Sequence, residues 1–180
     1  MRTSLPVVIV AVCLSVACGE KNIPLGSTPA AQGPNTAEAA RKQLEGRWVL
    51  LSLNAAAADG RYATVDATGE LELDAFGNLR IDYRLSDAGQ ATLEGLGIHP
   101  PNPVIRTEGR VVINPQDQSV VYVNPDASSQ PFDRELAARR QNPFALERPR
   151  FYTLGADGVL TLVTRHDNGK DAATSRWRRL

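Results

Sequence analysis

Apolar and polar positions alternate with a period of two through much of the chain after residue 46. Residues 70–74 read ELELD and residues 79–85 read LRIDYRL, with a glycine-containing break between them. Strict alternation predicts half-buried β-strands, and the break predicts a hairpin. Residues directly opposite in an antiparallel pair share a face, so a loop of three or five residues sets Leu71 and Leu73 beside Leu79, Ile81 and Tyr83. The charged positions 70, 72, 80, 82 and 84 are then expected outside, as a solvated ladder.

The C-terminal part of the chain predicts a second group of paired strands. Asn168-Gly169 favours a two-residue type I′ turn, which pairs Asp167 with Lys170. That register places Leu162 opposite Ser175 and Leu160 opposite Trp177. A five-residue loop at 155–159 independently places Tyr152 opposite Leu162. One continuous face carrying Tyr152, Leu154, Leu160, Leu162 and Trp177 is therefore expected inside.

The chain is expected to be mainly β. Further strands are expected at 47–51, 109–113 and 120–123, which gives about eight in all, joined mostly as neighbours. Eight antiparallel strands with one apolar face close naturally into an up-and-down barrel, and a two-layer sandwich is the alternative. An N-terminal helix is expected after the N-cap Thr36, ending at Gly46. Two short inserted helices are expected at 86–97 and 132–141.

The N-terminal part has a different character. Arg2 is followed by a nearly unbroken apolar run from Leu5 to Leu14, which is typical of an export signal and too short for a transmembrane helix. Residues 19–35 are rich in Gly, Pro, Ala and polar side chains, so they predict a flexible linker. The expected organisation is an export signal at 1–17, an anchor and linker at 18–35, and a barrel domain at 36–180.

Cys18 stands where the export signal ends. The chain has two cysteines, and Cys13 would leave with the signal, so Cys18 could form no internal disulfide. The segment Ala17-Cys18-Gly19 resembles a bacterial lipobox, although Ser15 stands where that motif usually carries an apolar residue. The resemblance implies a lipoprotein acylated on Cys18 and, with Gly19 next to it, sorting to the periplasmic side of the outer membrane. A plain secreted protein is the alternative, since Ser15 and Ala17 also suit ordinary cleavage.

Composition and motifs give little support to other classes of function. Lys plus Arg and Asp plus Glu number 20 each, whereas a nucleic-acid partner would call for a basic face. His99 and His166 are both expected to be exposed loop residues. No HExxH, CxxC, GxSxG or phosphate-binding glycine loop occurs, so we expect no enzyme, cofactor or metal. Membrane contact is expected through the lipid anchor alone.

Short motifs at both ends of the domain resemble lipocalin-like proteins. Residues 44–48, LEGRW, are similar to the family's opening G-x-W motif after a short helix, here Gly46 and Trp48. Residues 150–154, 160–162 and 176–178 resemble the closing strands of bacterial lipocalin-like domains. In that family a basic side chain from the last strand covers the opening tryptophan, a role that the resemblance assigns to Arg176, Arg178 or Arg179. The register above, however, turns Arg176 and Arg178 outward.

An eight-stranded barrel is either filled by its own side chains or open to one small ligand. The expected function is non-catalytic binding of a small hydrophobic or amphipathic molecule. The candidate pocket consists of inward-facing residues of the expected strands, namely Leu71, Leu73, Ile81, Tyr83, Tyr152, Leu162 and Trp177. The alternative is a filled barrel that binds another envelope protein, or serves a structural role, through its loops. The proline-rich segment 125–149 is expected to be either a lid over the barrel or a surface insertion.

Overall fold

A computed structural model describes residues 36–100, 102–123 and 142–180. The expected export signal, Cys18, the linker and the expected helix at 132–141 lie outside the described residues. The described part contains two helices and nine strands. In chain order they are α1 (Ala37–Leu44), β1 (Gly46–Ala56), β2 (Tyr62–Val65), β3 (Ala67–Leu73), β4 (Asn78–Leu85), α2 (Asp87–Gly95), β5 (Val104–Asn114), β6 (Ser119–Tyr122), β7 (Arg150–Leu154), β8 (Val159–Arg165) and β9 (Asp171–Arg179).

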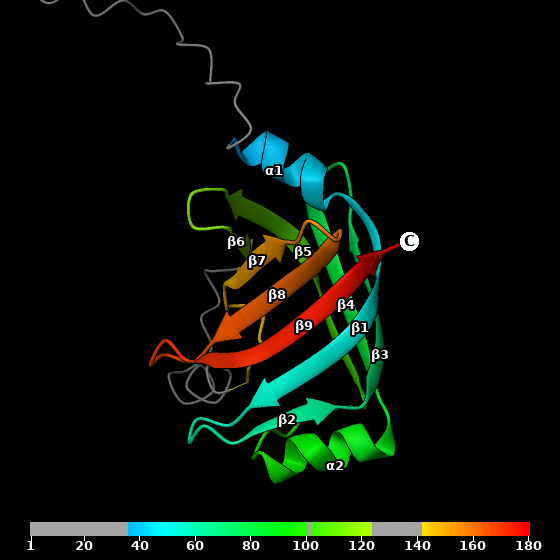
Figure 1. The fold of residues 1–180 in the computed structure, drawn as a ribbon, viewed down its shortest axis with the longest axis vertical. Coiled ribbons are helices and arrows are strands. Elements are labelled where there is room, and N and C mark those ends of the chain that lie inside the picture. The colour runs from blue at the N-terminus through cyan, green and yellow to red at the C-terminus, as the bar shows by residue number, and fades with distance from the viewer. Residues whose placement is uncertain (1–35, 101, 124–141) are drawn as a thin grey trace, which may run out of the picture. The chain divides into compact units, whose positions relative to one another are not determined.

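Eight of the strands form a closed antiparallel barrel, as predicted. From β3 to β9 each strand pairs with the next along the chain, and β1 closes the barrel by pairing with both β3 and β9 (Figure 1). The short strand β2 was not predicted from the sequence. It pairs with the C-terminal half of β1, for example Val65 with Leu53. Figure 1 shows α1 at one end of the barrel and α2 at the other.

The β3–β4 hairpin has the predicted register. Leu71 lies opposite Ile81 and Leu73 opposite Leu79, across a five-residue loop. The loop is stabilised by the carboxylate of Asp74, which accepts hydrogen bonds from the backbone N–H groups of Phe76 and Asn78, both at 2.8 Å. Gly77 supplies the positive φ, +82°, that the turn requires.

One outward-facing residue of this hairpin departs from the expected solvated ladder. Asp82 does point away from the barrel interior, but only 6% of it is exposed. The guanidinium groups of Arg80 and Arg106 each lie 2.6 Å from its carboxylate. Burial tends to raise the pKa of Asp82, but the hydrogen bonds from both arginines outweigh it and lower the pKa. Two long basic side chains thus cover a carboxylate on the outer surface.

The β8–β9 hairpin has the predicted register but not the predicted turn. Leu160 lies opposite Trp177 and Leu162 opposite Ser175. The turn is longer than two residues, since the His166 N–H bonds the Lys170 carbonyl at 2.7 Å. Among the turn residues only Gly169 has a positive φ, so the type I′ turn is wrong. A register shift between Thr164 and Arg165 absorbs the extra residue, which restores the predicted pairing further along the strands.

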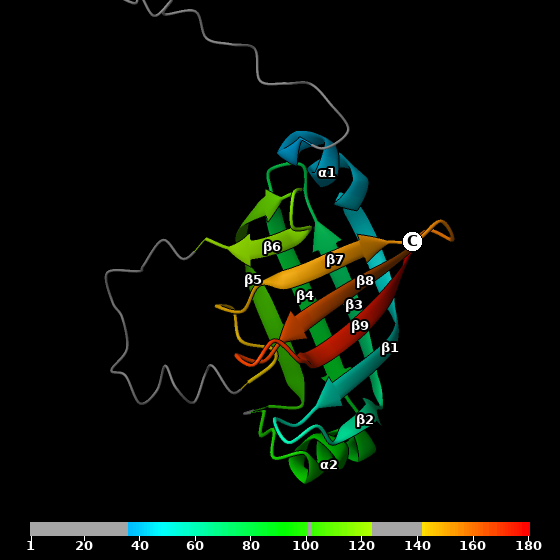
Figure 2. The ribbon, with the colours of Figure 1, turned by 60° about the vertical axis from the view of Figure 1, so that its left-hand side comes forward.

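Both described helices begin at the predicted caps. Thr36 accepts from the N–H of Ala39 at 3.2 Å, and Ser86 accepts from the N–H of Gly89 at 3.1 Å. Ser86 also donates to the carboxylate of Asp66 at 2.6 Å, which fixes α2 against the turn between β2 and β3 (Figure 2). A Cβ at position 89 would lie 2.1 Å from the Asp66 carbonyl oxygen, so only glycine permits this approach.

Candidate functional site

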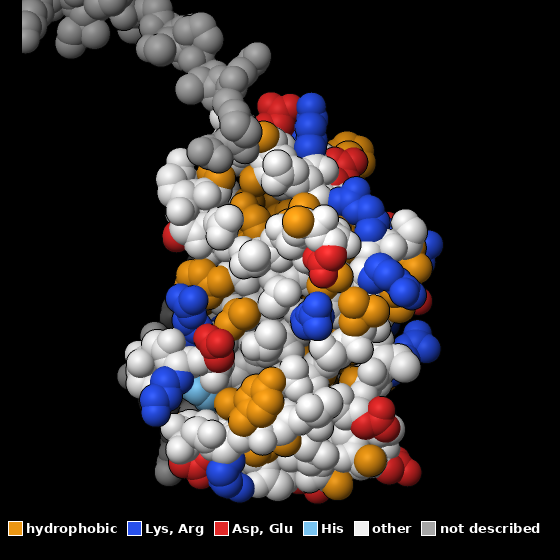
Figure 3. All heavy atoms as spheres, viewed as in Figure 1, with side chains coloured by type: hydrophobic (Ala, Val, Ile, Leu, Met, Phe, Trp, Pro, Cys, Tyr) orange, Lys and Arg blue, Asp and Glu red, His pale blue; other side chains and the backbone are white. Residues whose placement is uncertain are grey.

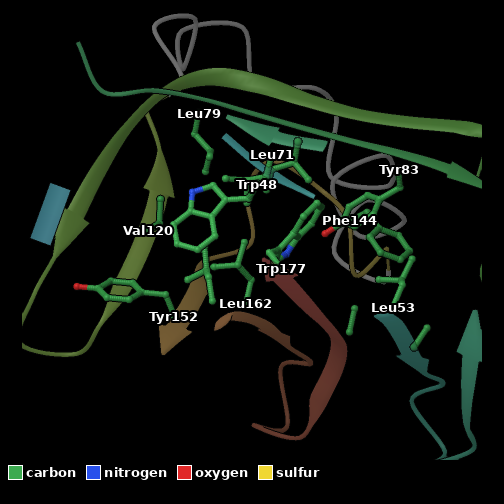
Figure 4. Close-up of a cluster of buried hydrophobic side chains, with 14 of the residues drawn as sticks. Trp48, Leu53, Leu71, Leu79, Tyr83, Val120, Phe144, Tyr152, Leu162 and Trp177 are labelled. Atoms are coloured by element: carbon green, nitrogen blue, oxygen red, sulfur yellow. The ribbon is translucent and has the colours of Figure 1, made fainter. Parts of the chain in front are cut away.

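All seven residues of the predicted pocket lie inside the barrel. Each is at most 7% exposed, and they come from strands β3, β4, β7, β8 and β9. Figure 4 shows most of them in one continuous cluster with Trp48, Leu79, Val120 and Phe144. Trp177, which is 0% exposed, lies in the middle of that cluster. The sequence thus predicted correctly that these side chains lie in the interior. The same prediction for Leu154 was wrong, because this residue at the end of β7 is 38% exposed.

These side chains fill most of the space that they surround. The cavity that the described residues form inside the barrel has a volume of about 10 Å³. A buried water needs ~10–15 Å³ by the same measure, whereas ligand pockets usually measure ~300–1,000 Å³. A ligand larger than a water molecule would therefore have to displace a side chain to enter this cavity.

Phe144 is the side chain best placed to be displaced, because a loop and not a strand carries it into the barrel. It is 5% exposed, and its ring centroid lies 5.5 Å from that of Tyr83, which packs at the same distance against Trp177. The loop is held locally, since the side chain of Asn142 accepts from the Phe144 N–H at 2.9 Å. Phe144 was not predicted from the sequence, because a loop residue has no place in a period-two pattern.

Polar groups gather around the small cavity beneath Phe144. Ser175 Oγ accepts from the Tyr83 hydroxyl at 3.2 Å and from Trp177 Nε1 at 2.8 Å. Burial raises the pKa of Tyr83 to about 12, so this phenol stays protonated at neutral pH. Thr164 also lines the cavity, and its buried Oγ1 has no hydrogen-bond partner. The cavity is thus a polar pocket inside an otherwise apolar core.

Arg150 is the charged member of this group. It is 4% exposed, and its guanidinium lies 4.8 Å from the centroid of the Tyr122 ring. The guanidinium donates to the carbonyl of Arg148 at 3.0 Å, and to those of Phe144 and Ala145 at 3.4 Å each. Burial lowers its pKa, and the nearby charge of Glu147, which raises the pKa, does not offset this effect. Arg150 points inward as Tyr152 does, because the two residues are two positions apart on β7, and this parity was the signal in the sequence that could have predicted it.

The opposite end of the barrel holds the structural motif residues. The indole N–H of Trp48 donates to the Leu44 carbonyl at 3.0 Å, which joins β1 to the end of α1. Arg179 covers the Trp48 ring, with its guanidinium carbon 4.6 Å from the centroid. Arg176 and Arg178 are exposed on the outer face, so neither covers Trp48. Gly46 has a φ of +132°, which other residues rarely adopt, at the point where α1 passes into β1.

A second cavity lies on the surface, near the end of the barrel where α2 packs. It measures about 420 Å³, and its lining comes from the β1–β2 turn, the segment after α2, Arg148 and the β8–β9 turn. His166 lies in the lining and is half-buried rather than exposed as predicted, since its Nε2 is 3.0 Å from the Ala56 carbonyl oxygen. His99 is exposed, as predicted.

The surface in Figure 3 carries no concentrated charge, and the described residues form no group of metal ligands. Figure 3 shows basic and acidic side chains interspersed over one face of the molecule, with only scattered hydrophobic ones. Within residues 36–100, 102–123 and 142–180, no group of three or more His, Cys, Asp or Glu side chains could hold a metal ion. None of the helices in these ranges is long and apolar enough to span a membrane.

Comparison with known proteins places the chain in no family. No family model matches it, and no curated protein is similar to it. Among solved structures, the chain is similar to a redesigned β-barrel with 14% sequence identity and a TM-score of 0.37. The match covers 78% of this chain and 95% of that one. Similarity at this level carries no inference about function, so the proposals below depend on the chain's own geometry.

Proposed function

We propose that this protein is a lipid-anchored barrel of the bacterial cell envelope that binds one small amphipathic molecule inside the barrel without chemical change. The observation that carries the proposal is the polar cavity beneath Phe144. An apolar core with a few convergent polar groups is the usual composition of a small-molecule site. The cavity lies where a loop side chain completes the core, so a ligand could take that side chain's place while the strand ladder stays intact.

The energy of such an exchange is modest. Fully burying a phenylalanine side chain stabilises a protein by ~1.5–3 kcal/mol. An apolar chain of similar size that entered the barrel would recover that contribution by burying its own surface. The cost of displacing Phe144 is therefore offset by the part of the ligand that replaces it. The net binding free energy then comes from the other contacts of the ligand.

The anchor and the compartment rest on the sequence. The export signal, the lipobox-like segment at Cys18 and the linker support a protein tethered at the periplasmic side of the outer membrane. Replacing Cys18 with Ala should move the protein from membrane to soluble fractions. Unchanged fractionation of the variant would contradict the anchor.

Binding inside the barrel can be tested with the fluorescent amphiphile 1-anilinonaphthalene-8-sulfonate. Phe144→Ala should raise the affinity of the barrel for this probe by about tenfold, because a competing side chain is removed. Phe76→Ala is the matched control, since Phe76 lies on the β3–β4 turn and is 81% exposed. Equal affinities for Phe144→Ala and the unmodified protein would contradict an internal site.

The surface cavity near His166 supports a second candidate function, the binding of another envelope protein through loops. Loops from separate segments build it, and its volume is about 420 Å³, so a side chain of a partner protein has room to enter. If the probe binds there, Ala58→Leu, which places a larger side chain at an exposed position of the lining, should weaken probe binding. Binding inside the barrel would leave the affinity of this variant unchanged.

A further inference from the structure

We propose that the polar pocket around Arg150 is an anion site, and that it selects an amphipathic ligand with a carboxylate head group. This inference rests on the proposed function, because it names the ligand class of the same internal site. It begins from the charge of Arg150. Arg150 carries that charge at 4% exposure, and the nearby charge of Glu147 does not offset the cost of its burial.

A buried guanidinium normally has an anionic partner, since removing a charge from water is costly unless it is paired. Arg150 has five N–H donors, and its hydrogen bonds reach three backbone carbonyls, two of them at a long 3.4 Å. The Tyr122 ring contacts the Arg150 guanidinium through its face, and this contact uses none of the N–H donors. Donor capacity therefore remains on a cation that borders the cavity.

The other polar groups of the pocket complement an anion rather than a cation. Thr164 is 7% exposed, and its hydroxyl, which has no partner, borders the same cavity as Arg150. Tyr83 and Ser175 line it as well. The Tyr83 hydroxyl already donates its one proton to Ser175 Oγ, whereas the Ser175 hydroxyl can still donate its own. None of the residues that line this cavity is acidic. One guanidinium and two hydroxyl donors form a site that would repel an ammonium group and attract a carboxylate.

The position of Phe144 determines where the apolar tail of the ligand would lie. Phe144 and Pro143 line the cavity on its loop side, and Leu162 and Ala173 line it from the strands. A ligand whose head group lies against Arg150 would place its tail where the Phe144 ring packs against Tyr83. This arrangement favours a linear aliphatic acid over a neutral lipid of the same length.

The test compares decanoate with decanol at pH 7.5 by isothermal titration calorimetry on the purified domain. The two probes share a chain and differ in the head group. Decanoate should bind at least tenfold more tightly. Equal affinities would overturn the anion site and leave the proposed function intact, whereas no binding of either probe would overturn both.

Two variants and one spectroscopic measurement assign the preference to this pocket. Arg150→Met should abolish the preference for decanoate, and Thr164→Val should reduce decanoate affinity several-fold. Arg179→Met, which removes the other guanidinium stacked on an interior aromatic ring, should leave the preference unchanged. If Arg150→Met fails to fold, decanoate labelled with carbon-13 in its carboxyl group provides the answer on the unmodified protein. The pKa of the bound carboxyl should be at least one unit below that of the free acid, and an unshifted or raised pKa would overturn the proposal.

Discussion

The two ends of the barrel are filled in different ways. At the α1 end, strand-borne Trp48 is 1% exposed, its indole N–H is bonded, and Arg179 covers its ring. At the α2 end, loop-borne Phe144 completes the core above a polar cavity, and Thr164 Oγ1 has no partner. A core supplied by strands and fully hydrogen-bonded can open only when the sheet breaks. A core completed by a loop can open locally, which is what a binding site requires.

The largest expected effect is on the α1 end. Trp48→Ala should lower the free energy of unfolding by ~3–5 kcal/mol, because the sheet around a strand residue cannot collapse into the space that is left. Urea denaturation followed by circular dichroism measures this change. A loss below ~1 kcal/mol would show that the α1 end is no more firmly packed than the other.

Phe144→Ala should have a smaller effect on stability. A loss of about 2 kcal/mol is expected, below the usual range for phenylalanine in a rigid core, since the loop at 142–149 can shift to cover the space. The same denaturation experiment measures it. If Phe144→Ala lowers the free energy of unfolding as much as Trp48→Ala does, the two ends of the barrel are packed equally firmly, which contradicts the comparison.

A matched pair of buried threonines tests the hydrogen bonding at the α2 end. Thr107 Oγ1 lies 3.1 Å from the Tyr122 hydroxyl, so Thr107→Val should destabilise the protein by ~1 kcal/mol. Thr164→Val removes a hydroxyl without a partner and should stabilise the ligand-free protein by up to ~1 kcal/mol. Thermal unfolding of both variants checks the signs, and a loss of stability in Thr164→Val would mean that its hydroxyl is satisfied.

The smallest effect is expected at Arg179. Its contact with Trp48 is near the surface, where a cation over an aromatic ring contributes ~0.5–1 kcal/mol. Arg179→Met should therefore shift stability by about that amount, and Arg178→Met, on the outer face of the same strand, by less. Equal changes in stability for the two variants would mean that the contact of Arg179 with Trp48 does not stabilise the α1 end.

The register of the barrel was predictable because alternation and loop length together determine which residues share a face. The same parity extends from Trp177 to Arg179, which is why Arg179, and not Arg176 or Arg178, reaches Trp48. At the β8–β9 turn the predicted turn type was wrong, and a register shift between Thr164 and Arg165 restored the predicted pairing. The residues of a turn and the pairing of its strands constrain a hairpin separately. In this hairpin the strand pairing determined the register.

The features that distinguish the α2 end were harder to predict. Phe144 follows no strand period, so nothing in its local sequence indicates that it enters the core. Asp82 was correctly placed on the outer face, yet it is buried because two arginines from neighbouring strand positions cover it. The exposure of a surface residue depends on the long side chains around it, and alternation alone does not describe them.

A crystal structure of the domain with decanoate tests the central claim most directly. We expect the Phe144 ring to leave the barrel, the carboxylate to contact Arg150 and Thr164, and Trp48 to keep its position against Leu44. Decanoate in the surface cavity beside His166, with Phe144 still packed against Tyr83, would contradict the account.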